Sequence, residues 1–437
     1  MTGVRVRESP PLGVIAPFFL AAPLGLAIAG FILMRVDDTA FLAVNIPHLV
    51  AATHATVLGW LTLAIMGAIY QLGPSVFGGH LVSLRLARYQ FIVHIASVVC
   101  FIPAIYTWNT YWMAGAGVGV VISFILFLIN AIPAIAWFRR GSMPRMFISV
   151  ALLFLIAGAS FGITYVGDLE HGWFPITQGR LSGHAHLGLV GFLALVLMGV
   201  SYQTVPMFQV VRRGAARFER PVLIITTVAA SSGALIFMTD PPPLVRVGIA
   251  IALAAGPALW IADVVRMLRS RSRRMLDVHT RATVVSLAFL VAAIVVGIAA
   301  AGGEALSPGG QPARLQLAYG ILAIGGWGGS TLIGSSFKIV PFLVWNARYL
   351  HLAGREPVPS IADLSSERWN HATLGLHSLA VAVLAAGALG GQLAVVHIGG
   401  LLLAGAGLSH CLALVSVVFH HPASRASDSA PMKGLTT

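Results

Sequence analysis

Charged side chains are scarce in this sequence. Asp, Glu, Lys and Arg make up 9% of its 437 residues, whereas a typical soluble domain has about 25%. So little charge excludes a soluble enzyme, and a hydrophobic content of 57% excludes an intrinsically disordered chain. Cysteine is rarer still, because Cys100 and Cys411 are the only two and both lie in apolar runs. We therefore expect neither a disulfide framework nor a thiolate metal site.

Long apolar segments take the place of charge, and each is long enough to cross a hydrocarbon core of about 30 Å. The pattern is typical of a polytopic helical membrane protein, and 47 glycines indicate helices that pack closely or leave room for a bulky group. We predict an all-α integral membrane protein, a single membrane domain over residues 1–437 with twelve transmembrane helices in a lipid bilayer. The predicted segments are 14–34, 46–73, 89–106, 113–137, 146–167, 183–208, 221–239, 247–266, 283–302, 315–344, 371–390 and 393–419.

The basic residues are distributed unevenly between alternate loops. Loops and termini on one side hold 22 Lys and Arg, whereas the other side holds only Arg35, Arg180, Arg246 and Arg314. Because Lys and Arg mark cytoplasmic loops, this asymmetry predicts cytoplasmic termini, with a cytoplasmic tail at 421–437, in a bacterial-type inner membrane. The net charge of +13 is thus a topology signal, and we expect no nucleic-acid partner. The first apolar segment has no convincing cleavage site, so we interpret it as a retained span.

An internal repeat runs through the sequence. The cores are residues 54–74, 186–206 and 321–341, and their starts are 132 and 135 residues apart. Without gaps they align two glycines, an aromatic residue between them, a Tyr or Phe, and a final proline. Such self-similarity predicts three pseudo-symmetric units of four helices each.

Histidines at matched depth are the candidate site residues. His54 and His186 fall at equivalent repeat positions in the predicted outer half of the bilayer, where ionisable residues are usually functional. Two such imidazoles can ligate one haem iron, and imidazole also binds copper or zinc. The alternative is that each histidine only hydrogen-bonds a neighbouring helix. His184 points about 200° away from His186 around the helix, and the additional candidate ligands near the outer side are His48 and His397.

Two motifs resemble heme–copper oxidase subunit I, especially its C class. Residues 183–208, GHAHLGLVGFLALVLMGVSYQTVPMF, are similar to the signature of its tenth helix, with a His-x-His pair. Residues 54–60, HATVLGW, resemble its second helix, whose single His is an axial ligand of the low-spin haem. The NnrS family of haem-containing membrane proteins is similar in general layout. The resemblance implies a twelve-helix fold, electron transfer or oxygen or nitric oxide chemistry, and a redox partner or second subunit.

The sequence also departs from that family. Its His-x-His pair lies on the sixth segment, the tenth segment has Tyr319 and Ile321 instead, and the seventh segment contains no histidine. The usual copper ligands are therefore missing. We expect no proton-pumping oxidase activity from this chain alone, and whether the protein is an enzyme stays open.

From the residues and the resemblance together we expect a non-covalently bound b-type haem, because no Cys-x-x-Cys-His is present. The axial pair would be His54 and His186, with His184 as a ligand to a second haem or to copper, for which His48 and His397 are further candidates. The alternatives are a non-enzymatic haem or copper handling protein and a secondary transporter. The near absence of carboxylates from the apolar segments is evidence against a transporter.

Overall fold

The computed structural model describes residues 9–135, 142–211, 214–272, 277–303 and 312–420, and its regular secondary structure is helical apart from two isolated β-bridges. Twelve spans within these residues are long and apolar enough to cross a membrane, and each coincides with a predicted segment to within a few residues. The all-α, twelve-span fold predicted from the sequence is confirmed. The predicted tail 421–437 lies outside the described residues.

The spans fall into three consecutive units of four. The first unit is α1 (Leu12–Leu33), α2 (Pro47–His54) continuing through η3 (Ala55–Thr62) into α3 (Leu63–Ser75), α4 (Leu84–Tyr106) and α5 (Thr110–Ile135). The second is α6 (Met143–His171), α7 (Gln178–His186) with η4 (Leu187–Ala194) and α8 (Leu195–Gln209), α9 (Glu219–Phe237) and α10 (Pro243–Arg269). The third is α11 (Val278–Gly302), α12 (Pro312–Gly320) with η6 (Ile321–Gly329) and α13 (Ser330–Arg348), α14 (Glu367–Gly390) and α15 (Leu393–Val418). Short 3₁₀ turns, η2 (Asp38–Phe41) and η7 (Ile361–Leu364), lie in loops.

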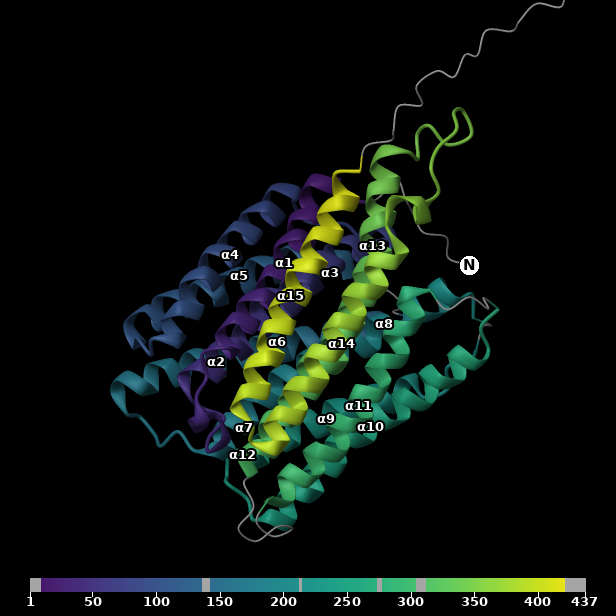
Figure 1. Ribbon diagram of the computed structural model, residues 1–437. Coiled ribbons are helices and arrows are strands. Elements are labelled where there is room, and N and C mark those ends of the chain that lie inside the picture. Colours follow the sequence, from purple (N-terminus) through teal and green to yellow (C-terminus); the bar gives the residue numbers. More distant parts are fainter. Residues whose placement is uncertain (1–8, 136–141, 212–213, 273–276, 304–311, 421–437) are drawn as a thin grey trace, which may run out of the picture.

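The first and last spans lie side by side, which joins the third unit to the first (Figure 1). A Cβ at Gly30 of α1 would fall 2.6 Å from the carbonyl oxygen of Gly400 on α15. Only a residue without a side chain allows backbones to approach this closely, as is common between membrane helices. The three units are therefore in contact as a ring rather than as an open row.

The segments η3, η4 and η6 are π-helical, and they occupy the same place in the three repeat cores. π-Helices are rare and are frequently found at functional sites. A Cβ at Gly328 of η6 would lie 3.3 Å from Leu193 of η4 and 3.6 Å from Leu61 of η3. These three residues are equivalent in the repeat, so the π-helical segments meet around a pseudo-threefold axis.

Glycines at two levels bring the first span of each unit against its π-helical span. A Cβ on any of these glycines would come within 3.3 Å of the neighbouring helix. The two levels are seven residues apart on the first span in every unit. The contacts are Gly67–Phe18, Gly199–Phe147 and Gly334–Ala282 at one level and Gly59–Gly25, Gly191–Phe154 and Gly326–Phe289 at the other. The repeat predicted from the central spans thus includes the spans before them.

Two buried histidines donate hydrogen bonds to backbone carbonyls of the π-helical segments η3 and η6. His94 Nε2 donates to the carbonyl of Leu58 at 3.1 Å, and His377 Nε2 donates to the carbonyl of Gly325 at 2.9 Å. Both carbonyls lie four residues beyond the first position of their repeat core. A change from α to π hydrogen bonding disturbs backbone pairing, which is costly inside a membrane unless another group satisfies it. These histidines therefore fix the backbone of the π-helical segments.

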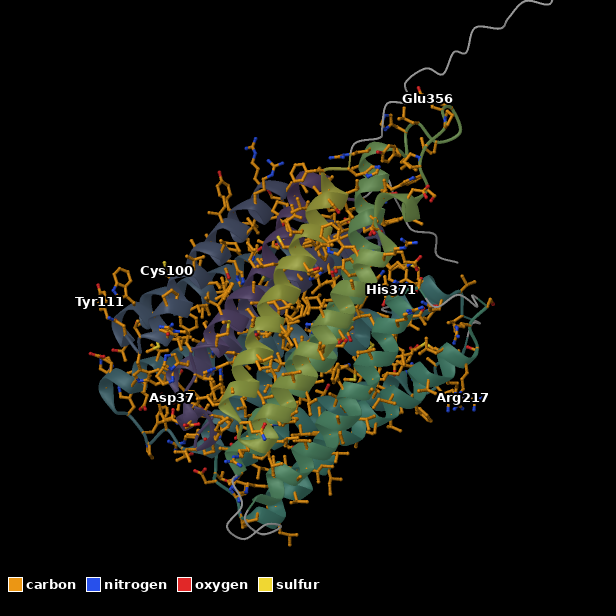
Figure 2. The ribbon with its side chains drawn as sticks, in the orientation of Figure 1. Asp37, Cys100, Tyr111, Arg217, Glu356 and His371 are labelled. Carbon is orange, nitrogen blue, oxygen red and sulfur yellow. The ribbon has the colours of Figure 1, made fainter. Side chains whose placement is uncertain are left out.

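The two ends of the bundle can be tested for orientation. Figure 2 shows Asp37 and Glu356 at opposite ends, and the loop charges predict Asp37 external and Glu356 cytoplasmic. Reporter fusions after Arg145 and Glu356 should therefore read as cytoplasmic, and a fusion after Trp173 as external. An external signal after Glu356 would contradict the predicted orientation of the whole bundle.

Candidate haem site

Two imidazoles from different units face one another where the first unit meets the second. His54 ends α2 directly before the π-helical segment, and His184 lies on α7. Their ring centroids are 6.4 Å apart and their planes differ by 16°. A first-row metal ion lies about 2 Å from an imidazole nitrogen, so rings on opposite sides of one ion have centroids roughly 6 Å apart. The separation matches that arrangement.

The hydrogen bonds of His54 fix which nitrogen is available. Its Nδ1–H donates to the carbonyl of Val50 at 2.8 Å, one turn earlier on α2. The lone pair is then on Nε2, and a backbone partner of this kind commonly orients metal-bound imidazoles. In the opposing ring, the Nδ1 atom of His184 is buried and has no hydrogen-bond partner with good geometry. Both rings are half-buried within their spans.

Aromatic and small residues surround this pair. Phe101 of α4 packs edge-on against His54 with centroids 5.7 Å apart, and Tyr165 of α6 packs against His184 at 5.8 Å. A Cβ on Gly162 would lie 3.2 Å from Cε1 of His184, whereas a Cβ on Gly188 would meet nothing within 4 Å. Paired nitrogen donors, two aromatic neighbours and the open space beside Gly188 fit a flat macrocycle. The residues present therefore suit a haem.

His186 lies in a different environment. Its Nδ1–H donates to the carbonyl of Ser182 at 2.7 Å, and the hydroxyl of Tyr319 on α12 donates to its Nε2 at 3.3 Å. Phe237 of α9 packs on the same ring with centroids 5.0 Å apart. The sequence hypothesis paired His54 with His186, but the structure brings His54 to His184 instead. The opposite directions of His184 and His186 follow from their two-residue spacing on one helix.

The contacts His54–His184 and His186–Tyr319 join the same two repeat positions at successive interfaces. The repeat cores begin at residues 54, 186 and 321. The first residue of one core faces the residue that lies two places before the first residue of the next core. His54 thus faces His184 across the first interface, and His186 faces Tyr319 across the second with centroids 5.9 Å apart and planes again at 16°. The corresponding positions for the third interface hold Ile321 and Ala52, which cannot ligate a metal.

The remaining candidate ligands are engaged elsewhere. His48 packs against Tyr106 with centroids 4.5 Å apart, and His397 Nε2 donates to the carbonyl of Val36 at 2.8 Å. Among the residues that the structure describes, no three His, Cys, Asp or Glu side chains are grouped to hold a metal ion. The copper site that was considered for His184 with His48 and His397 is therefore not assembled.

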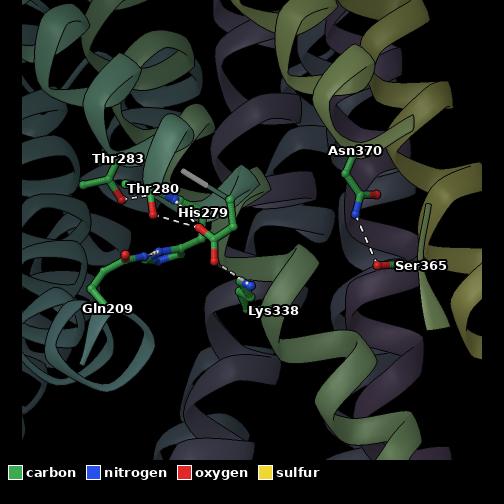
Figure 3. Close-up of polar contacts among 8 residues, drawn as sticks. Gln209, His279, Thr280, Thr283, Lys338, Ser365 and Asn370 are labelled. Carbon is green, nitrogen blue, oxygen red and sulfur yellow. Dashed lines mark hydrogen bonds and ion pairs between the residues drawn. The ribbon is translucent and has the colours of Figure 1, made fainter. Parts of the chain in front are cut away.

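A polar cluster at the predicted cytoplasmic end was not found from the sequence. Asp277, directly before α11, forms an ion pair with Lys338 of α13 at 2.8 Å, while Gln209 lies 3.4 Å from Nδ1 of His279 (Figure 3). Burial raises the pKa of Asp277, but the ammonium of Lys338 and hydrogen bonds from Thr280 outweigh this and hold the pKa well below its usual value. Lys338 is the only charged residue of the predicted segment 315–344, and that isolation is the signal that could have revealed the pair.

Replacing Lys338 with Met should destabilise the protein by about 3 kcal/mol, because a buried carboxylate loses its partner. Since the pKa of Asp277 is lowered by folding, its contribution is present above about pH 4 and is lost as acid protonates the carboxylate. Unfolding in detergent micelles at pH 7 and pH 3 measures both effects. The double variant Lys338→Met/Asp277→Asn should recover most of the loss. A Lys338→Met protein as stable as its parent would show that the pair contributes nothing.

Comparison with solved structures decides the fold. A chain from the cryo-EM structure of a heme–copper terminal oxidase dimer superimposes with a TM-score of 0.66, covering 94% of this chain and 83% of that chain at 11% identity. The chain has the heme–copper oxidase fold. The resemblance read from residues 54–60 and 183–208 is thus confirmed for the architecture. No protein-family model matches the sequence, and no curated protein matches it either.

Proposed function

We propose that the protein binds one b-type haem between His54 and His184 and uses it to transfer electrons within the membrane. The observation that supports this most directly is the pair of nearly parallel imidazoles, 6.4 Å apart, on repeat-related helices of two units. The fold is shared with a heme–copper terminal oxidase. A haem supplies reversible one-electron chemistry whose potential depends on axial ligands and burial.

The residues of the chain have distinct tasks in this proposal. His54 and His184 would hold the haem iron, and the Val50 carbonyl orients the His54 ring. Phe101 and Tyr165 pack against the two rings and exclude water from them. Because both His54 and His184 would ligate the iron, a haem held there would supply electron transfer rather than direct binding of oxygen or nitric oxide.

The absorption spectrum of the purified protein tests the proposal. We expect one b-type haem per chain by the pyridine haemochrome assay and low-spin spectra in both redox states. The haem should remain bound when apomyoglobin is added in excess, whereas a haem-handling protein would release it. Folded protein that takes up no haem from added hemin would contradict the proposal.

A further inference from the structure

A chamber of about 190 Å³ lies between the second and third units, and residues of α7, η4, α9, α10, α11, α12 and η6 line it. Gln178 and Gln316 line the end that the charge pattern predicts to be external, and Trp327 lies toward the other end. Arg246 and Pro257 of α10 both line it, and the eleven positions from one to the other correspond to a helical rise of about 16 Å. The chamber therefore extends through about half of a hydrocarbon core of about 30 Å, which is the depth of one leaflet.

The walls of the chamber below its outer end are apolar. Alanine, leucine, isoleucine, valine and glycine provide most of the lining residues. His186 and Tyr319 also line it, but they are hydrogen-bonded to each other at 3.3 Å. Water does not fill an apolar cavity that offers it few partners, and empty space forfeits dispersion contacts. The walls thus favour an apolar guest.

Two thinly covered spans separate the chamber from the lipid phase. In α10 and α11, 28% and 22% of the most apolar window is buried inside the protein, the lowest shares among the described spans. The residues that these helices contribute to the chamber include the small Ala254, Ala293 and Gly297. An acyl chain of a neighbouring lipid is therefore the apolar group nearest to the chamber.

The outer end of the chamber holds two opposite charges that are not paired with each other. Arg246 lines this end, and its Nε is buried without a hydrogen-bond partner. Asp240, in the turn before α10, accepts a hydrogen bond from the backbone N–H of Gly179 at 3.0 Å. Neither side chain forms an ion pair with another described residue. Because a buried donor without an acceptor is costly, this end suits a ligand that brings an anion to Arg246 and a cation to Asp240.

We propose that the chamber holds an acyl chain of one phospholipid whose phosphoethanolamine head group binds Arg246 and Asp240. The phosphate oxygens accept hydrogen bonds from the guanidinium, whose planar fork matches them well. The primary ammonium pairs with the Asp240 carboxylate, which would repel a head group that is only anionic. The chain extends past Ala254 toward Trp327. This site lies at a different interface from that of His54 and His184 and does not depend on the proposed function.

Native mass spectrometry of delipidated protein in detergent, with lipid added back, measures the binding. Dioleoylphosphatidylethanolamine should form a one-to-one adduct at least about tenfold tighter than dioleoylphosphatidylglycerol or oleate. Arg246→Gln removes charge-assisted hydrogen bonds and should weaken the adduct about tenfold. Arg217→Gln, the same change on the predicted cytoplasmic side (Figure 2), should bind like the parent. Asp240→Asn keeps an oxygen for the Gly179 N–H and should bind the two phospholipids equally.

A phosphatidylethanolamine with a brominated acyl chain reports where the chain lies, because bromine quenches tryptophan fluorescence on contact. Trp327 is 2% exposed, so lipids around the bundle reach it poorly. Quenching that is present in the parent and absent from Trp327→Phe therefore marks a chain inside the chamber. Ala254→Phe fills part of the chamber and should remove both this quenching and the adduct.

Four results would overturn the proposal. They are equal affinity of Arg246→Gln and Arg217→Gln for phosphatidylethanolamine, equal binding of the three lipids by the parent, an unchanged adduct in Ala254→Phe, and parent quenching that persists in Trp327→Phe. Should Ala254→Phe fail to fold, the arginine pair and the Trp327 quenching decide the question.

Discussion

Replacing either His54 or His184 with Ala should abolish the low-spin haem spectrum of the purified protein. Loss of a partner that merely orients a ligand costs about 10–100-fold in metal affinity, so loss of the ligand itself should cost more. We expect little haem to survive purification of either variant. Haem content by pyridine haemochrome and the low-spin signals in electron paramagnetic resonance measure the outcome.

The decisive comparison is with His186→Ala, two residues along the same helix. If His184 is the ligand, His184→Ala loses the low-spin spectrum and His186→Ala keeps it. If His186 is the ligand, as the sequence alone suggested, His186→Ala loses the spectrum and His184→Ala keeps it. His371→Ala, labelled in Figure 2, is a control because its Nδ1–H donates to the Glu367 carbonyl of its own helix. A normal spectrum in both His54→Ala and His184→Ala would exclude the proposed pair.

The sequence predicted the spans and the repeat because both depend on local patterns. Each span must cover its length with apolar residues, so segments such as 14–34 and 315–344 nearly coincide with Leu12–Leu33 and Pro312–Arg348. The glycines of the cores align because each prevents a clash with the preceding span, as Gly199 does with Phe147. These constraints therefore place apolar residues and glycines at fixed positions in the sequence of every unit.

The sequence patterns could not predict which two histidines face each other. Matched depth made His54 and His186 equivalent, but equivalent positions in a rotationally symmetric ring point into different interfaces rather than toward each other. A contact across an interface therefore joins two different repeat positions, here those of His54 and His184. The same reasoning shows why Tyr319 was noted only as a missing histidine: its role depends on facing His186 from the next unit.

If the two interfaces are variants of one site, restoring the missing imidazole should convert the second into a copy of the first. In the variant Tyr319→His, a shorter ring without a hydroxyl would stand opposite His186, whose Nδ1–H is already held by the Ser182 carbonyl at 2.7 Å. Gly297, whose Cβ would lie 2.9 Å from the ring of Tyr319, corresponds to Gly162 beside His184. We expect the haem content to rise from one to two per chain, with both haems low-spin. A Tyr319→Phe variant is the matched control, because it removes the same hydroxyl without supplying a ligand. If Tyr319→His folds and still binds a single haem, the equivalence of the two interfaces does not extend to their ligand chemistry.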